Sequence, residues 1–182
     1  MKDEFVHSWW HAVGREGRWP LLEWLEKETD FFTAPASAGH HLNEEGGLVV
    51  HSLHVYERLL EIAERDLERE MTEEERETAA VIGLLHDVCK IGLYHRDASG
   101  AWVKQDKLPL GHGEKSVYLI QKKMELRSDE ALAIRWHMGA YDAAAKGGSR
   151  ELNAAMIATP WVWWLHEADM AATQWEERQA DD

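Results

Sequence analysis

Several common features are missing from this chain, and each absence excludes a class of protein. Cys89 is the only cysteine in 182 residues, so no disulfide can form within the chain, and such sparse cysteine is typical of a reducing compartment. No apolar run approaches the roughly 18 residues that a membrane-spanning helix needs. The first residues, MKDEFVHSWWHAV, include acidic side chains where a signal peptide carries only basic ones. We therefore expect a soluble cytoplasmic protein with no membrane segment.

Basic side chains are also scarce. The chain has 20 lysines and arginines against 34 aspartates and glutamates, which gives a formal net charge of -14. Such a charge repels the phosphates of nucleic acids, so we expect no stable binding to duplex nucleic acid. A bound metal ion can reverse the sign of the field inside a pocket, so a small anionic substrate is compatible with this composition. No oligomeric state is favoured.

The apolar pattern predicts an all-α domain of about seven helices. These helices are expected to start at or just after Pro20, Leu48, Thr72, Gly113, Ser128, Ser149 and Pro160. Thr72 with Glu75 forms a capping-box pattern. Residues 93–105 lose helical periodicity at a Ser-Gly pair and predict one short β-hairpin. The length fits a single domain over residues 1–182, with low complexity confined to its polar end, EERQADD.

The adjacent pair His86-Asp87 differs from the other histidines of the chain in its setting. It follows the apolar run VIGLL, so both side chains are expected to be buried. A buried imidazole beside a buried carboxylate is costly unless the two are paired or bind a metal ion. Lys90 follows within one turn and shares their helical face. Two interpretations stay open for these residues alone: a structural Asp–Lys ion pair beside a core histidine, or a metal site whose lysine holds a substrate phosphate.

Four further residues favour the metal interpretation. His51 lies on a helix with an apolar face, and Asp169 is an acid within a strongly apolar helix. His112 begins a helix between two glycines, and His137 ends another helix. Each of them alone would more often be a core or capping residue than a ligand. Together with the doublet they place imidazole or carboxylate groups on five successive elements, and the converging helices of a bundle build metal sites from such residues.

This set of residues resembles the metal-binding signature of the HD-domain superfamily of phosphohydrolases. His51, the doublet His86-Asp87 and the distal Asp169 follow the order of that signature, and HDVCK resembles the family's HDxxK motif. The resemblance covers most of the chain, from about residue 31 to residue 173. It implies an HD-domain helical bundle and a metal-dependent phosphohydrolase.

The segment before the first metal histidine resembles one branch of that superfamily. APASAGHHLNEEGGLVVHSLHV is similar to the HD domains of 3′-to-5′ exoribonucleases, in which a histidine pair precedes Gly-Gly-Leu, and His40 and His41 fit that pair. His112 and His137 resemble the extra histidines of HD proteins that hold two metals, cyclic dinucleotide phosphodiesterases among them. The chain shows neither the nucleic-acid-binding barrel of the exoribonucleases nor the Gly-Tyr-Pro signature of the cyclic dinucleotide enzymes. The expected partner is therefore a small nucleotide or a short oligonucleotide.

The resemblance also implies a role for each site residue. Asp87 bridges two ions, and the full set of implied metal ligands is His51, His86, Asp87, His112, His137 and Asp169. Four imidazoles among six ligands favour divalent transition ions (Fe, Mn, Co, Ni or Zn) over Mg²⁺ or Ca²⁺. The implied catalytic residues are Asp87, Lys90 and His41. The implied substrate contacts are Lys90, His40, His41 and Arg135, of which Arg135 is equally well explained as a solvated helix residue.

The expected function is hydrolysis of a phosphodiester or phosphate ester of a nucleotide or short oligonucleotide by a metal-activated water. Two alternatives stay open. One is a (deoxy)nucleoside phosphate nucleotidase that uses one metal, and the other is a non-catalytic HD sensor that binds metal or nucleotide. A degenerate sensor is expected to lose the doublet, the lysine or the distal acid, whereas this chain keeps all of them.

Overall fold

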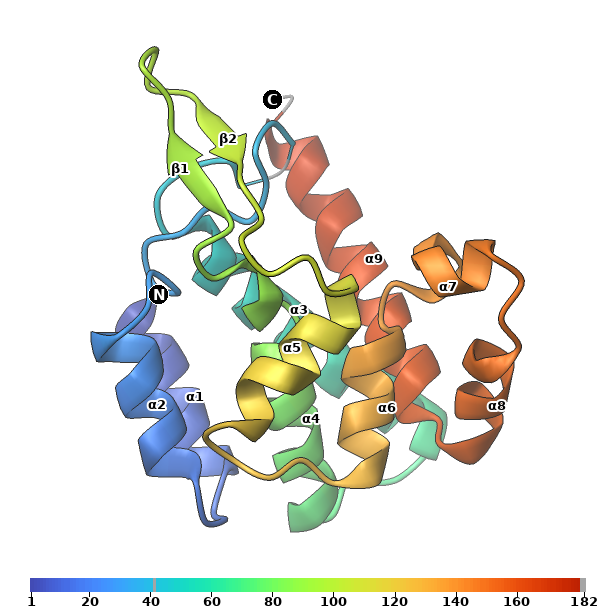
Figure 1. Cartoon of the computed structure of the whole chain (residues 1–182). Coiled ribbons are helices and arrows are strands. Elements are labelled where there is room, and N and C mark those ends of the chain that lie inside the picture. Colours follow the sequence, from blue (N-terminus) through green and yellow to red (C-terminus); the bar gives the residue numbers. More distant parts are fainter. Residues whose placement is uncertain (41, 181–182) are drawn as a thin grey trace.

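The computed structural model describes residues 1–40 and 42–180, which form nine α-helices and one β-hairpin (Figure 1). The helices are α1 (Lys2–Ala12), α2 (Arg18–Lys27), α3 (Gly47–Leu67), α4 (Glu73–Leu85), α5 (His112–Gln121), α6 (Ser128–Trp136), α7 (Ala143–Lys146), α8 (Glu151–Ala158) and α9 (Trp161–Ala180). Short 3₁₀ turns follow α4 (Val88–Lys90) and α6 (Gly139–Tyr141). The expected all-α class with one short hairpin is confirmed.

The start of α4 follows the predicted capping chemistry. The Thr72 hydroxyl accepts a hydrogen bond from the Glu75 backbone N–H at 3.2 Å, and Glu75 Oε2 accepts one from the Thr72 backbone N–H at 2.8 Å. This reciprocal capping box begins α4. The seven expected helices correspond to α2 to α6, α8 and α9, whereas α1 and the four-residue α7 were not expected. Within the described ranges, no helix combines the length and the apolar character needed to cross a membrane.

The hairpin consists of β1 (Tyr94–Arg96) and β2 (Trp102–Lys104) and lies where the sequence predicted it. Its antiparallel register pairs Tyr94 with Lys104, His95 with Val103 and Arg96 with Trp102. The guanidinium carbon of Arg96 lies 4.3 Å from the centroid of the Trp102 ring, a cation–π contact that joins the two strands. Figure 1 shows the hairpin projecting from one end of the helical body.

Helix α3 is the centre of the core, because it packs against both α4 and α9. The buried apolar side chains of these three helices include Leu48, Leu53, Val55, Leu59, Ile82, Leu84, Leu85, Leu165 and Ala168. Burying one leucine of this kind stabilises the fold by roughly 1.5–3 kcal/mol. A Cβ atom on Gly83 would lie only 2.8 Å from the Cα atom of Tyr56, so the close crossing of α3 and α4 requires glycine there. This crossing holds the two helices that carry His51 and His86 side by side.

A network of buried charges fixes the segment after α1 onto α4 and α6. Glu77 Oε1 accepts hydrogen bonds from the backbone N–H groups of Gly14 at 2.7 Å and Arg15 at 3.1 Å. The same carboxylate pairs with the side chains of Arg15 and Arg127, and Arg15 also pairs with the buried Glu130. Burial alone would raise the pKa of Glu77, but the Gly14 amide and Arg15 outweigh it and hold that pKa below its ordinary value.

Glu77→Gln should lower the free energy of unfolding by about 1–3 kcal/mol at neutral pH, because a neutral amide cannot satisfy the donors that surround the carboxylate. A carboxyl whose pKa is lowered by folding stabilises the native state above its unfolded pKa of about 4.3 and loses that contribution as the pH falls towards the folded value. The free energies of unfolding measured with urea should therefore differ between wild type and variant at neutral pH, and the difference should shrink in acid. The exposed control Glu16→Gln should show no such trend. A difference that is independent of pH would contradict this role for Glu77.

Candidate metal centre

The doublet His86-Asp87 lies at the end of α4, where the helix changes to a 3₁₀ turn. The sequence predicted one helix through HDVCKI, but α4 ends at Leu85 and the chain tightens over Val88–Lys90. The tighter turn keeps the lysine of the motif beside the acid, since Lys90 Nζ lies 2.6 Å from Asp87 Oδ2. His86 and Asp87 are both buried, as expected.

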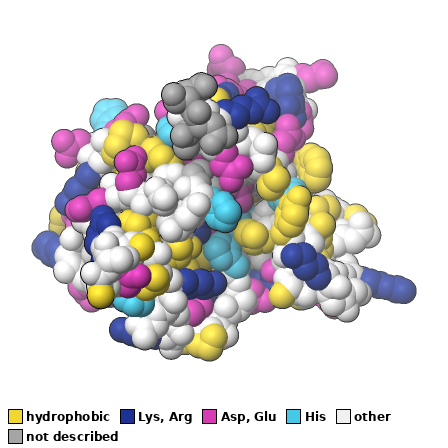
Figure 2. All heavy atoms as spheres, turned by 90° about the horizontal axis from the view of Figure 1, so that it is seen from above, with side chains coloured by type: hydrophobic (Ala, Val, Ile, Leu, Met, Phe, Trp, Pro, Cys, Tyr) yellow, Lys and Arg dark blue, Asp and Glu magenta, His cyan; other side chains and the backbone are white. Residues whose placement is uncertain are grey.

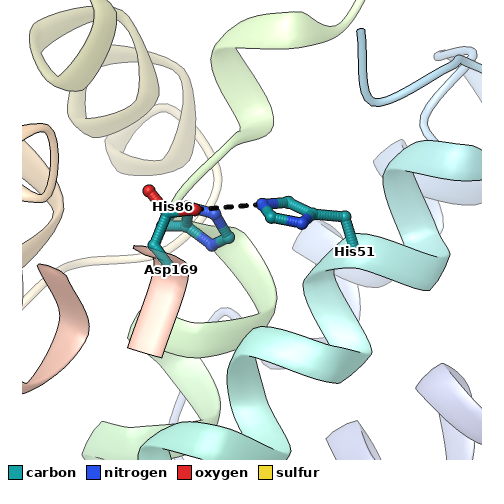
Figure 3. Close-up of side chains that lie close together, drawn as sticks. All are labelled: His51, His86 and Asp169. Carbon is teal, nitrogen blue, oxygen red and sulfur yellow. Dashed lines mark ion pairs between the residues drawn. The ribbon is translucent and has the colours of Figure 1, made fainter. Parts of the chain in front are cut away.

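Three of the predicted ligands converge from three helices and form what we call the His51 group (Figure 3). His51 comes from α3, His86 from the end of α4 and Asp169 from α9. One donor atom of each lies within 4.8 Å of the others. His51 Nε2 lies 3.2 Å from Asp169 Oδ1. This spacing allows one ion to contact all three side chains.

The other three predicted ligands form a second cluster, the His112 group. It consists of Asp87, His112 at the start of α5 and His137 directly after α6, and their donor atoms again lie within 4.8 Å of one another. His112 Nε2 lies 2.7 Å and His137 Nε2 lies 3.7 Å from Asp87 Oδ1. A Cβ atom on Gly113 would lie 2.1 Å from the carbonyl oxygen of Arg135, so only glycine lets α5 come this close to α6.

Asp87 lies between the two groups and directs one oxygen toward each. Its Oδ2 atom lies 3.8 Å from His51 Nε2 and 3.6 Å from His86 Nε2. Its Oδ1 atom faces His112 and His137. A carboxylate with this arrangement fits the bridging role that the family resemblance implies for Asp87.

The orientation of two imidazoles fits a metal site. His86 Nδ1 lies 2.9 Å from the carbonyl oxygen of Gly83, and His137 Nδ1 lies 2.7 Å from that of Ile134. Each Nδ1–H therefore donates to the backbone, which leaves the lone pair of Nε2 available. Both Nε2 atoms are buried and have no hydrogen-bond partner among the described residues. Buried polar atoms are rarely left unsatisfied, so these two nitrogens fit a ligand that binds lone pairs, as a cation does.

The electrostatics of the site keep its carboxylates ionised. Burial opposes the charge of Asp87, but Lys90 and the neighbouring histidines outweigh burial and hold the pKa of Asp87 well below its usual value. The pKa of Asp169 is likewise lowered, since its hydrogen bond to His51 and the nearby imidazoles outweigh burial. Burial lowers the pKa of His86 to about 4, so this imidazole is neutral and can act as a ligand. Burial also opposes the charge of His51, yet its hydrogen bonds to Asp169 and a buried glutamate raise its pKa to about 9.

The predicted substrate contacts lie in different settings. Lys90 is almost fully covered and is paired with Asp87. Arg135 Nη2 lies 2.5 Å from Glu114 Oε1 and its Nη1 lies 3.0 Å from Asp142 Oδ2, so both ends of its guanidinium contact carboxylates. His40 is exposed, and its backbone N–H donates to Ser37 Oγ at 2.9 Å. The substrate roles of these three residues stay predictions.

His41 lies outside the described residues. Its predicted catalytic and substrate-binding roles therefore stay predictions from the sequence.

Helix α9 supplies two site residues that sequence reasoning did not select. Glu176 is buried, and its carboxylate contacts the Nδ1 atom of His51. His166 Nδ1 donates to the carbonyl oxygen of His137 at 2.7 Å. Glu176 is the first residue of EERQADD, the polar segment interpreted from the sequence as low-complexity. His166 lies three residues before Asp169 on the same helix, a spacing that the sequence shows but that does not by itself require a role. Glu176 lies seven residues after Asp169 on the same helix face, and this spacing is the signal that could have identified it.

The candidate centre is partly exposed at His112 and Asp169. Figure 2 shows histidine side chains near the middle of the face seen from above, with basic, acidic and apolar side chains around them. The side chain of His112 is 32% exposed and that of Asp169 is 15% exposed, whereas His51, His86 and His137 are buried. Ligands can therefore approach from the side of His112 and Asp169.

Comparison with known protein families identifies one matching family model. The family model described as "HD domain" matches residues 48–173, a range that contains all six predicted metal ligands. Comparisons with curated proteins and with solved structures found no match. HD domains are typically metal-dependent phosphohydrolases, and the His/Asp clusters described above could bind the metal ions. The chain belongs to the HD-domain family.

Proposed function

We propose that this protein hydrolyses a phosphodiester or phosphate ester of a nucleotide or short oligonucleotide with the help of two divalent transition ions. The observation that carries this proposal is the sharing of Asp87 between two clusters of imidazole and carboxylate donors. The His51 group with Asp87 Oδ2 would hold one ion, and the His112 group would hold the other. Four imidazoles in the set favour Fe, Mn, Co, Ni or Zn. When bound, such ions act as Lewis acids that activate water and polarise phosphate oxygens.

The chain's own residues then bind and orient the phosphate. Lys90 Nζ lies 2.6 Å from Asp87 Oδ2, which supports the proposal that Lys90 holds negative charge on phosphate oxygens next to the shared carboxylate. His40 and His41, on the loop before α3, are proposed to contact the phosphate or to protonate the leaving oxygen. Arg135 is a further proposed anion contact, for which it would have to exchange one of its carboxylate partners.

The substrate is proposed to be small. A net charge of -14 works against a long polyanion, whereas the few cations near the site suffice for one or two phosphates. The resemblance that the sequence of the loop before α3 suggests to exoribonuclease HD domains supports the proposal of diester cleavage, and so does the pair of ligand groups.

Metal analysis of the purified protein, together with hydrolysis assays, tests the proposal. The assays would use bis(4-nitrophenyl) phosphate as diester, 4-nitrophenyl phosphate as monoester, and a panel of nucleotides and dinucleotides. Two equivalents of transition metal with diester cleavage are expected. One equivalent with release of phosphate from nucleotides would replace the proposal by a one-metal nucleotidase. Absence of both metal and turnover under any added divalent ion would leave a non-catalytic sensor.

A further inference from the structure

Glu176 is a buried carboxylate that joins two histidines of α3. It lies near the end of α9 and is 4% exposed. Its Oε2 and Oε1 atoms lie 3.0 Å and 3.2 Å from His51 Nδ1, and Oε1 lies 2.7 Å from His54 Nδ1. The two histidines are one helical turn apart, so the carboxylate spans both of them.

The contact with His51 determines which nitrogen faces the candidate metal site. An ionised carboxylate only accepts hydrogen bonds, so the Nδ1 atom of His51 carries the hydrogen and donates it to Glu176. Nε2, which faces Asp169 and Asp87, is then the nitrogen whose lone pair a metal ion would bind once that ion replaces the hydrogen shared with Asp169. A carboxylate behind a ligating imidazole fixes both its tautomer and the rotation of its ring.

The contact with His54 holds the carboxylate itself in place. His54 is on the same helix as His51, and its ring lies edge-on to Trp175 with 5.0 Å between centroids. Glu176 is therefore fixed from a neighbouring position on α3 that takes no part in either ligand group. Helix α9 therefore provides the predicted ligand Asp169 and, two turns later, Glu176, which supports the facing ligand His51.

We infer that Glu176 is a positioning residue for the metal centre, which acts through His51 and sets the affinity of the His51 group. This inference rests on the proposed function, because it requires that the group binds a metal. Loss of such a carboxylate partner typically weakens metal binding or activity by about 10–100-fold. The effect should be specific to the His51 group, because the ligands of the His112 group contact other partners.

A double-mutant cycle with Co²⁺ as the probe tests this inference. Co²⁺ affinity and the visible Co²⁺ spectrum would be measured for wild type, Glu176→Gln, His51→Ala and the double variant. Glu176→Gln should weaken Co²⁺ binding to the His51 group by about 10–100-fold and alter the spectrum of the ion bound there. In the His51→Ala background the same change should have less than about a threefold effect, because the residue through which Glu176 acts is gone.

Three controls separate positioning from general support of the fold. Glu167→Gln makes the same change on α9 at a residue that pairs with Arg65, and it should leave Co²⁺ binding unchanged. His54→Ala removes the other contact and should have a smaller effect than Glu176→Gln. In a His112→Ala background, where only the His51 group can bind tightly, the loss caused by Glu176→Gln should persist.

The outcomes that overturn the inference are equally specific. Unchanged affinity and spectrum in folded Glu176→Gln would show that the carboxylate does not position His51. An equal loss in the presence and absence of His51 would show that Glu176 only supports the fold. If wild type itself binds no Co²⁺, Zn²⁺ or Mn²⁺, the proposed function fails first, and this result is distinct from both outcomes above.

Discussion

Asp87→Asn should remove metal from both ligand groups and lower turnover on the order of 10⁴-fold. The reason is the position of the carboxylate, whose Oδ2 faces His51 and His86 while its Oδ1 faces His112 and His137. An asparagine has the same size but only one oxygen and no charge, so it cannot serve both groups. Metal content after dialysis and hydrolysis of the diester reporter would be measured together.

A comparison with Asp169 makes this prediction specific. Asp169 belongs to the His51 group alone, so Asp169→Asn should lose one equivalent of metal where Asp87→Asn loses two. Loss of Asp87 also leaves Lys90 buried without its partner, which costs about 3–5 kcal/mol. The double variant Asp87→Asn/Lys90→Met removes both charges and keeps the test valid if the single variant unfolds. A folded Asp87→Asn that retains two equivalents would contradict the bridging role.

The full ligand set was predicted from the family resemblance, and some of its members are also visible because they interrupt otherwise apolar patterns. His86 and Asp87 follow a fully buried run, and Asp169 lies among apolar residues such as Leu165, Ala168 and Ala172 of α9. A polar group in such a place must have a partner, and the convergence of helices in a bundle limits where the partners can be. The structure brings all six predicted ligands into two adjacent groups.

The parts that could not be predicted depend on contacts between distant segments. Glu176 looks like part of a charged tail, and only the packing of α9 on α3 reveals that it is buried against His51, 125 residues away in the chain. The change from α4 to a 3₁₀ turn at Asp87 has no signal in the apolar pattern, because VIGLLHDVCKI has no proline or terminal glycine at that point. Such features are decided by tertiary structure and not by local propensity.

The two interpretations of Lys90 make different predictions for one variant. The structure shows the ion pair of the structural interpretation, with Nζ 2.6 Å from Asp87 Oδ2. Burial lowers the pKa of Lys90, but Asp87 outweighs it, so the ammonium stays charged. A divalent ion at Asp87 would take over the neutralisation of the carboxylate and leave the lysine available for a phosphate. The ion pair is therefore compatible with both interpretations.

Lys90→Met should destabilise the metal-free protein by up to about 3–5 kcal/mol, since it leaves the buried Asp87 carboxylate without its ammonium partner. Added Mn²⁺ or Zn²⁺ should restore that stability, because the cation replaces the lost positive charge. Turnover at saturating metal should nevertheless fall by about 10²–10³-fold if Lys90 holds the phosphate during the reaction. Thermal unfolding with and without metal, followed by the diester assay, measures both effects on the same preparation.

A second buried lysine provides the control for this experiment. Lys115 Nζ pairs with Asp106 Oδ1 at 2.9 Å, and neither residue belongs to a ligand group. Lys115→Met should lose stability that metal does not specifically restore, and it should keep its turnover. If Lys90→Met turns over as fast as wild type at saturating metal, Lys90 only neutralises Asp87 before metal binds. The site would then need another cation for the phosphate, and Arg135, which lies beside the His112 group, would be the residue to change next.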